Sequence, residues 1–480
     1  MVIRVHHSDF FVLNLRTRMP FRYGIATLRA LPHLIVRATV EVDGKTVAGF
    51  AADGLPPKWF TKDPTSTYAQ ELADMVEVIR HACALAREIS TQRTPFALWR
   101  SVYEAQSAWA WGRFPALLSN FGVSLIERAV IDGFCRATGA AFHDAVRTNA
   151  LGMELGEMHE ELAARRPADF LPAAPLERIV VRHTIGLADP LSDADVRAAE
   201  RLNDGLPQTL EESIRAYGLI HFKIKLAGDV EQDVERLRQI AALLDAECPN
   251  YRFTLDGNEN YRNVEPFRRP WEKLAQDPSL AQFMSRLIFV EQPLHRDVAL
   301  SDESRRTLRA WADRPRMIID ESDDSPASLP RALDGGYIGT SHKNCKGVFK
   351  GIGSACLIAH RRRVFGGEYT ISAEDLTNVG PVALLEDLAV IATLGIAGAE
   401  RNGHHYFAGL SAFPGSIQEE ILVRHADLYR RHPGGFPTLR IERGTVSVGS
   451  VIAAPFGVSF NPDLSALTPL DAWDVNSLDR

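Results

Sequence analysis

Five short stretches of the sequence decide the fold: in four of them apolar residues lead into acidic or basic residues, and the fifth is a polar stretch that contains a lysine. They are Phe222-Lys223-Ile224-Lys225, Phe253-Thr254-Leu255-Asp256-Gly257-Asn258, Phe289-Val290-Glu291-Gln292-Pro293, Ile318-Ile319-Asp320-Glu321-Ser322 and Ser341-His342-Lys343-Asn344. The charged residues at positions 225, 256, 291, 320 and 343 are 31, 35, 29 and 23 residues apart, which is the length of one strand and one helix. Such a repeat is typical of a parallel barrel, which gathers the carboxyl ends of its strands at one mouth.

The repeat extends on both sides of these stretches. Runs rich in Val, Ile and Phe alternate with segments of helical periodicity, such as Val230–Leu244. The predicted strands are Ile179–Leu187, Leu219–Leu226, Arg252–Asp256, Leu287–Glu291, Met317–Asp320, Tyr337–Lys343, Arg363–Glu368 and Glu400–Phe407. Strands that alternate with helices in this way predict an α/β fold, a (β/α)8-type (TIM) barrel over residues 176–415. An open doubly wound sheet is the competing arrangement, and the charged strand ends favour the barrel.

Residues 1–175 have a different pattern, which predicts an N-terminal α+β capping domain. Two alternating runs, His33–Val42 and Thr46–Phe50, flank an Asp-Gly pair at positions 43 and 44, and this is typical of a β-hairpin. Helical patterns follow at Thr67–Thr91 and Leu117–Ala137. The last segment, 416–480, contains one more alternating stretch, and we expect it to pack back on the capping domain and complete it.

The composition is that of a globular protein, with 480 residues of which 45% are hydrophobic and 24% charged. The formal net charge of −7 argues against a nucleic-acid partner. The longest apolar stretch, residues 381–399, is interrupted by Glu386 and Asp387, so we expect no membrane span and no membrane partner. Five scattered cysteines without a C-x-x-C pair favour a reducing, cytoplasmic location over a disulfide framework.

Three of the charged strand ends carry carboxylates, Asp256, Glu291 and Asp320. Because neighbouring carboxylates repel one another, we expect a cation among them, and oxygen ligands without His or Cys favour Mg²⁺ over zinc. Lysines stand on either side: Lys343, and Lys225, which is suited to act as a base if its neighbour Lys223 and the nearby cation disfavour its charged form. This set is suited to removing the α-proton of a carboxylate substrate to give a metal-stabilised enediolate.

The motif order K-x-K, D-x-N, V-E-Q-P, D-E-S and then a lysine strand resembles the muconate-lactonizing-enzyme subgroup of the enolase superfamily, in the mandelate racemase/muconate lactonizing enzyme family. The resemblance covers roughly residues 178–410. It implies that Asp256, Glu291 and Asp320 bind Mg²⁺ and that Lys225 and Lys343 are the acid/base pair. Lys223 is expected to tune Lys225 or to bind the substrate carboxylate.

The resemblance extends to Pro20-Phe21-Arg22-Tyr23-Gly24, which is similar to the N-terminal specificity loop of that family. Arg22 and Tyr23 are therefore candidate substrate contacts. Asn258 is a candidate site residue with a simple turn role as its alternative, and Glu321 is a candidate for orienting a ligand or a lysine.

Two features depart from the pattern of the subgroup. Gly347 follows Lys343 one residue earlier than in K-x-x-K-x-G, so Lys346 or His342 is an alternative partner for Lys225. The His-Asp pair of the mandelate-racemase subgroup is not evident near the predicted seventh strand, where we interpret Glu368 and Asp375 as loop acids. A strand through His404 and His405 would point these two side chains to opposite faces.

We therefore expect a Mg²⁺-dependent isomerase or lyase that acts on a small-molecule carboxylate. Two lysines on opposite faces suit racemisation or epimerisation, but β-elimination (dehydration) and cycloisomerisation share the same intermediate and stay open. A metal-independent Schiff-base lyase that uses Lys223 or Lys225 is one alternative, and an inactive barrel used as a binding module is another. By resemblance we also expect a homo-oligomer.

Overall fold

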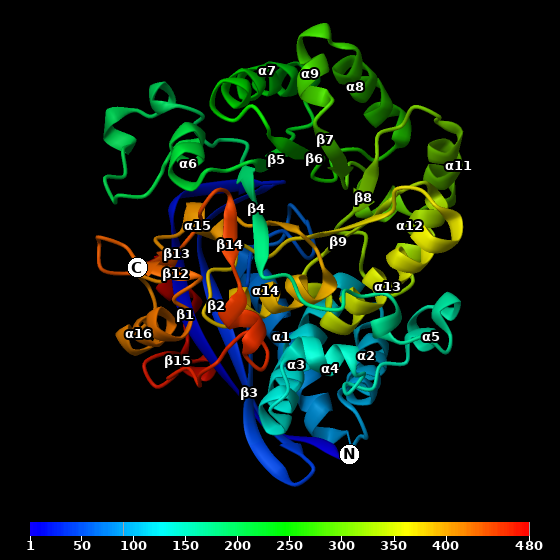
Figure 1. The fold of residues 1–480 in the computed structure, drawn as a ribbon, viewed down its shortest axis with the longest axis vertical. Coiled ribbons are helices and arrows are strands. Elements are labelled where there is room, and N and C mark those ends of the chain that lie inside the picture. Colours follow the sequence, from blue (N-terminus) through cyan, green and yellow to red (C-terminus); the bar gives the residue numbers. More distant parts are fainter. Residues whose placement is uncertain (90, 480) are drawn as a thin grey trace.

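The computed structural model describes residues 1–89 and 91–479 and shows a barrel, an N-terminal sheet covered by helices, and a C-terminal segment that touches both (Figure 1). Ser90, in the predicted helical range Thr67–Thr91, and Arg480, at the end of the predicted C-terminal segment, lie outside the described residues.

A closed ring of eight parallel strands forms the barrel within the described residues. These strands are β4 (Arg178–Ile185), β5 (His221–Lys225), β6 (Arg252–Asp256), β7 (Leu287–Glu291), β8 (Met317–Ile319), β9 (Gly339–His342), β10 (Thr370–Ala373) and β11 (Gly398–Glu400). Each strand pairs in parallel with the next, and β11 pairs with β4 to close the ring. The predicted α/β barrel is therefore confirmed, and the open doubly wound sheet is excluded.

Helices follow the strands and surround the ring (Figure 1). They are α6 (Leu210–Tyr217), α7 (Val230–Glu247), α8 (Val264–Gln276), α9 (Ala281–Met284), α10 (Arg296–Ala299), α11 (Asp302–Ala310), α12 (Ser328–Gly335), α13 (Val348–Phe365), α14 (Ala383–Leu394) and α15 (Gly403–Tyr406). The helix α7 is the amphipathic helix that the apolar periodicity of Val230–Leu244 predicts. It buries Val234, Leu237, Ile240 and Leu244, which recur at helical spacing, against the barrel.

Two of the predicted strands are wrong in position. Arg363–Glu368 was predicted as the seventh strand, but α13 continues to Phe365 and ends at Gly366 and Gly367, both with positive φ. The true seventh strand, β10, begins at Thr370. The eighth predicted strand, Glu400–Phe407, is wrong because β11 stops at Glu400 and the chain turns into α15. His404 and His405 therefore lie on one helical turn and not on opposite faces of a strand.

The capping domain consists of a three-stranded antiparallel sheet and helices that cover it. The elements are β1 (Ile3–Tyr23), β2 (Ala26–Val42), β3 (Lys45–Gly54), α1 (Tyr68–Glu88), α2 (Pro95–Ala110), α3 (Ala116–Thr138), α4 (Phe142–Arg147) and α5 (Leu155–Met158). Asp43 and Gly44 form the predicted hairpin turn with φ values of 48° and 82°. Positive φ at both central residues matches the twist of the flanking strands.

The C-terminal segment binds to both parts of the molecule. Its elements are α16 (Gly415–Arg424), β12 (Tyr429–Arg431), β13 (Pro437–Leu439), β14 (Thr445–Ser447), α17 (Gly449–Ala453) and β15 (Thr468–Pro469). β15 pairs with β1 of the capping sheet, whereas β14 pairs with β4 of the barrel. The segment therefore completes the capping domain, as predicted, and also ties it to the barrel. The exact division at 175 and 415 stays a prediction.

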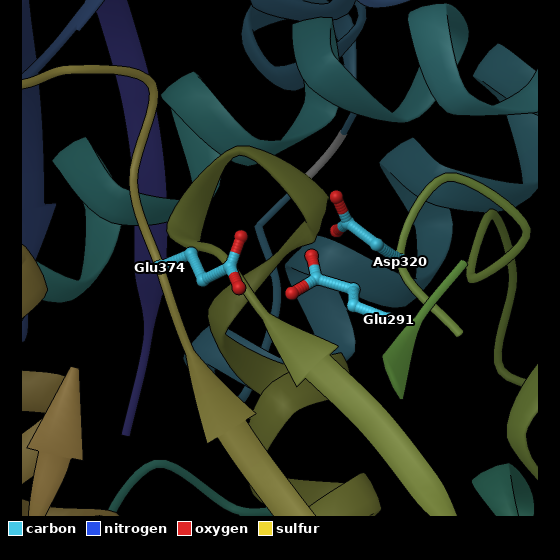
Figure 2. Close-up of side chains that lie close together, drawn as sticks. All are labelled: Glu291, Asp320 and Glu374. Carbon is cyan, nitrogen blue, oxygen red and sulfur yellow. The ribbon is translucent and has the colours of Figure 1, made fainter. Parts of the chain in front are cut away.

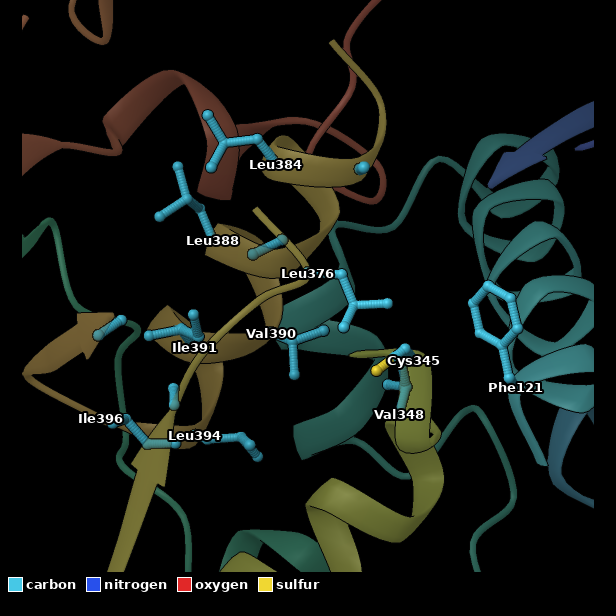
Figure 3. Close-up of a cluster of buried hydrophobic side chains, with 14 of the residues drawn as sticks. Phe121, Cys345, Val348, Leu376, Leu384, Leu388, Val390, Ile391, Leu394 and Ile396 are labelled. Carbon is cyan, nitrogen blue, oxygen red and sulfur yellow. The ribbon is translucent and has the colours of Figure 1, made fainter. Parts of the chain in front are cut away.

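Buried apolar side chains join the barrel to the capping domain (Figure 3). The helix α14 is buried along its whole length and contributes Leu384, Leu388 and Ile391, and Phe121 of α3 lies on the other side of the cluster. Glu386, which interrupts this apolar stretch, is fully buried beside Arg128, whose guanidinium also contacts Asp53 at 2.8 Å. No helix of the described residues has the length and apolarity that a membrane crossing needs.

A close helix crossing supports a prediction about the capping domain. A Cβ added at Gly122 of α3 would lie 2.3 Å from the carbonyl oxygen of Val78 in α1. We expect Gly122→Ala to lower the free energy of unfolding by about 1–3 kcal/mol, the usual cost of overpacking, measured by urea unfolding. Gly335→Ala in α12 is the control, since its nearest new contact is 3.9 Å away. If Gly122→Ala has the same midpoint urea concentration as the wild type, the two helices do not cross as closely as described.

Candidate active site

The strand register places the predicted site residues next to one another at the mouth of the barrel. Lys225 pairs with Asp256 across β5 and β6, and Asp256 pairs with Glu291 across β6 and β7. The ammonium of Lys225 donates to Asp256 Oδ2 at 2.5 Å. Burial and Lys223 lower the pKa of Lys225, but the Asp256 carboxylate outweighs them and raises it, so in this structure the charged form is not disfavoured. The spacing of the sequence motifs thus does bring Lys225, Asp256 and Glu291 side by side.

Lys223 lies at the centre of the mouth and is buried. Its Nζ lies 3.0 Å from Asp256 Oδ2, 2.9 Å from Glu291 Oε1, 2.7 Å from Glu374 Oε2 and 3.0 Å from Glu400 Oε2. Burial lowers the pKa of this lysine, but the four carboxylates outweigh burial and hold the pKa well above its ordinary value. Lys223 is therefore charged and binds carboxylates of β6 and β7 and of the residues that end or follow β10 and β11.

Glu291, Asp320 and Glu374 form the tightest group of carboxylates. Figure 2 shows their side chains converging from β7 and from the ends of β8 and β10. One carboxylate oxygen from each lies within 4.8 Å of the others, and all three residues are buried. Glu291 Oε2 is buried and makes no hydrogen bond to the described residues. Compact, buried oxygen donors with a free carboxylate oxygen fit a hard divalent cation such as Mg²⁺.

The pKa values in this group show which carboxylate lacks enough positive charge nearby to offset its burial. Burial, followed by the charge of Glu374, raises the pKa of Glu291 well above its ordinary value. Burial also acts on Asp320, but Lys343 and Lys346 outweigh it and lower the pKa of that carboxyl. Glu291 is therefore the carboxylate that gains most from an added positive charge.

Lys343 reaches the same group from the other side. Its Nζ lies 2.9 Å from Asp320 Oδ2 and 2.6 Å from Glu374 Oε2, and it faces the mouth cavity. Lys346 is held by Asp320 and by the carbonyl oxygen of Ser341, and burial lowers the pKa of His342 to about 3. Neither Lys346 nor His342 lines the cavity, so Lys343 is the lysine of this segment that faces it.

A cavity of about 60 Å³ lies over these residues, between the barrel and the capping domain. Lys225, Lys343, Glu374 and Glu400 line its base, and Tyr23 and Trp59 of the capping domain line its opposite wall. The Lys343 ammonium lies 5.4 Å from the centre of the Trp59 ring, which is a cation–π distance. The cavity therefore offers two amines, carboxylates and an aromatic wall.

The loop 56–62, which carries Trp59, is fastened to the barrel by Arg296 of α10. The guanidinium of Arg296 donates to the carbonyl oxygens of Phe60 at 2.8 Å and Trp59 at 2.9 Å. Two further bonds, at 2.8 and 2.7 Å, join it to the two oxygens of Glu259. Lys62 also contacts Glu259, at 3.4 Å. We call Arg296, Glu259 and Lys62 the latch.

The remaining predicted residues occupy different places. Asn258 lines the cavity, adopts a φ of 48°, and donates its backbone N–H to Asp256 Oδ1 at 2.8 Å. Glu321 lines the cavity too, and burial followed by the charge of Asp320 raises its pKa to about 8. Tyr23 lines the wall and donates its hydroxyl to the carbonyl oxygen of Pro57 at 2.8 Å. Arg22 is exposed and faces a separate cavity, because neighbouring residues of a strand point to opposite sides.

Sequence reasoning missed Glu374, Glu400 and the latch. Glu374 directly follows β10, and the misplaced seventh strand put that strand end at Glu368 instead. Glu368 is in fact an exposed partner of Arg316. Asp375 is a buried partner of Arg401 that lines the cavity, and not a solvent-facing loop acid. A correct assignment of the seventh strand would have found Glu374 from its position alone.

His404 and His405 lie outside the mouth cavity. His404 Nε2 is 3.1 Å from His183 Nδ1, and His405 Nε2 is 3.9 Å from Asp189. Burial holds the pKa of both histidines well below the ordinary value. The two histidines are therefore neutral, buried side chains that lie outside the lining of the mouth cavity.

The latch supports a prediction about the loop over the cavity. We expect Arg296→Ala to speed trypsin cleavage after Lys58 and Lys62 by about tenfold or more, because loss of one charge-assisted hydrogen bond costs about 1.5–3 kcal/mol. Mass spectrometry of the first fragments measures this. Arg262→Ala, an exposed neighbour paired with Asp297, is the matched control. If trypsin cleaves both variants after Lys58 and Lys62 at the same rate, Arg296 does not hold the loop.

Comparisons with known proteins agree with the fold. No protein-family model matches the sequence, and no curated protein matches it. A mandelate racemase/muconate lactonizing protein from Herpetosiphon aurantiacus is 17% identical and matches with a TM-score of 0.58 over 96% of this chain and 99% of its own.

Two further matches have ligands in their descriptions. A dipeptide epimerase from Enterococcus faecalis, complexed with Mg and the dipeptide L-Leu-L-Tyr, is 14% identical with a TM-score of 0.60 over 95% and 100% of the two chains. An enolase from Bradyrhizobium, complexed with magnesium and mandelic acid, is 13% identical with a TM-score of 0.55 over 98% and 97%. The chain therefore has the capped-barrel fold of mandelate racemase/muconate lactonizing enzyme structures.

Proposed function

We propose that the protein is a Mg²⁺-dependent enzyme that abstracts the α-proton of a small carboxylate substrate to give an enediolate. The observation that carries this proposal is that Lys225 and Lys343 line one cavity from different sides of the barrel, with a buried group of carboxylates between them. Solved structures of the same fold contain magnesium together with a dipeptide or mandelic acid, which supports the same class of substrate.

The two lysines have the roles of acid and base. Lys225 reaches the cavity from β5, and Lys343 reaches it from the residue after β9. A substrate α-carbon between them meets one amine on each face, so one lysine takes the proton and the other delivers a proton. Asp256 and Glu374 hold the two ammonium groups in place through the contacts described above. Lys223 is the positioning cation that keeps the carboxylates together.

Glu291 and Asp320 are the proposed metal ligands. The family resemblance implies Asp256 as the third ligand. The tightest group of carboxylates, however, contains Glu374 together with Glu291 and Asp320, so we favour Glu374 as the third ligand. The bound ion supplies positive charge that stabilises the negative charge developing on the substrate carboxylate. Asn258 and Glu321 complete the lining, and Tyr23 and Trp59 present apolar surface to the distal part of the substrate.

The outcome of the reaction follows from what happens to the enediolate. Return of a proton by the opposite lysine gives racemisation or epimerisation, whereas loss of a β-leaving group gives β-elimination, which is dehydration when water leaves. A lactone-forming cycloisomerisation runs such an elimination in reverse, with a carboxylate of the same molecule as the group that adds to the β-carbon. The amines on two sides favour racemisation or epimerisation. Assembly as a homo-oligomer and a cytoplasmic location stay predictions.

Solvent-deuterium exchange tests the proposal. With Mg²⁺ and a library of chiral α-substituted carboxylic acids, we expect exchange at the α-carbon of at least one acid, detected by ¹H NMR. Lys225→Ala should lower exchange of one enantiomer by about 100-fold or more, and Lys343→Ala should do the same for the other, because a positioned acid or base contributes about that much. EDTA should stop exchange in the wild-type protein.

Lys273→Ala is the control, since this lysine is exposed and, among the described residues, its ion pair is with Glu231 on the outer surface. Exchange that survives in Lys225→Ala and Lys343→Ala alike, or that is unaffected by EDTA, would refute the proposal. Trapping of the substrate by borohydride in the presence of EDTA would support the Schiff-base alternative instead.

A further inference from the structure

A second cavity lies at the opposite end of the barrel from the candidate active site. It has a volume of about 350 Å³. Its walls include the first residues of several strands, His221 of β5, Thr370 of β10 and Gly398 of β11, and the segment 170–172 that precedes β4. Barrel interiors are normally filled by side chains, so an open volume of this size at the amino-terminal end needs an explanation.

The charge of this cavity is one-sided. Arg182 and Arg362 line it, and none of the described residues that line it is an aspartate or a glutamate. His221 lines it as well, but burial lowers the pKa of this imidazole, so the positive charge comes from the two arginines. The mouth at the other end, in contrast, is lined by Asp320, Glu374 and further acids. A concave surface with cationic groups and no acids attracts anions and repels cations.

Arg182 gives the cavity a buried polar group that is only partly satisfied. The residue is 4% exposed. Its Nη2 donates to Ser372 Oγ at 2.8 Å and to Glu374 Oε1 at 3.1 Å, whereas its Nε has no hydrogen-bond partner among the described residues. A buried guanidinium with an unpaired donor is costly, and an anion is the partner that satisfies it best.

The second arginine, Arg362, lines the same cavity. Arg362, in the last turn of α13, uses its Nε for the carbonyl oxygen of Tyr369. Leu171, Ile358 and Leu394 supply apolar wall beside the arginines. The cavity thus combines a cationic end with an apolar wall, which complements the anionic end and the apolar body of a small organic carboxylate.

We propose that this cavity binds a small oxyanion, with a carboxylate on a short apolar body as its preferred form. The site is separate from the mouth and does not depend on the proposed reaction. The guanidinium of Arg182 reaches from this cavity to Glu374, so the two ends of the barrel share one side chain.

Isothermal titration calorimetry with benzoate and with inorganic phosphate, in EDTA, tests the proposal. We expect saturable benzoate binding to the wild-type chain. Arg362→Gln should weaken it about tenfold or more through the lost charge-assisted hydrogen bond, and Ala359→Phe should abolish it by filling the volume. Arg363→Gln is the matched control, since this neighbour also bonds one backbone carbonyl, that of Asp169, but does not line the cavity.

Lys225→Ala and Lys343→Ala separate this site from the mouth, and both should bind benzoate as the wild type does. Binding of phosphate as well would show that the charge alone is recognised, which also supports an oxyanion site. No saturable binding of either anion, binding unchanged in both Arg362→Gln and Ala359→Phe, or binding lost only in the mouth variants would overturn the proposal.

Discussion

The ammonium of Lys223, bound by four carboxylates, is the interaction on which the mouth of the barrel depends. Asp256, Glu291, Glu374 and Glu400 come from four different strands or the residues after them, and without a cation they would repel one another in a medium that screens charge poorly. Loss of one partner from a buried ion pair costs about 3–5 kcal/mol, because the other charge stays buried. Lys223 therefore fixes where the other charged side chains lie.

Residues next to this mouth also hold the loop of the capping domain that covers the cavity. The chain after β6 and β7 contains Asn258, Glu259 and Gln292, all with positive φ, a conformation that non-glycine residues seldom adopt. These turns aim Asn258 at the cavity and Glu259 at Arg296, and Arg296 fastens the loop that carries Trp59. Backbone strain of this kind persists where the surroundings over-determine it, and it is common at functional sites.

Much of this could be predicted from the sequence because the chemistry is periodic. The predicted strands Arg252–Asp256 and Leu287–Glu291 have the same bounds as β6 and β7, because in each the apolar residues lead directly into an acid. The seventh strand was misplaced because Val364 and Phe365 look like a strand, yet both are exposed at the end of α13. Glu374 was lost with it. The latch and the second cavity join residues far apart in the chain, and no local pattern shows such contacts.

In the proposed enzyme, carboxylates at the barrel mouth hold a divalent cation between two amines. Anomalous diffraction from a crystal soaked in Mn²⁺ tests it most directly, since Mn²⁺ accepts the same oxygen ligands as Mg²⁺. We expect a single strong peak bounded by Glu291 and Asp320, and the distances from that peak to Glu374 and Asp256 would identify the third ligand. No peak at the mouth, or a peak only elsewhere on the molecule, would contradict it.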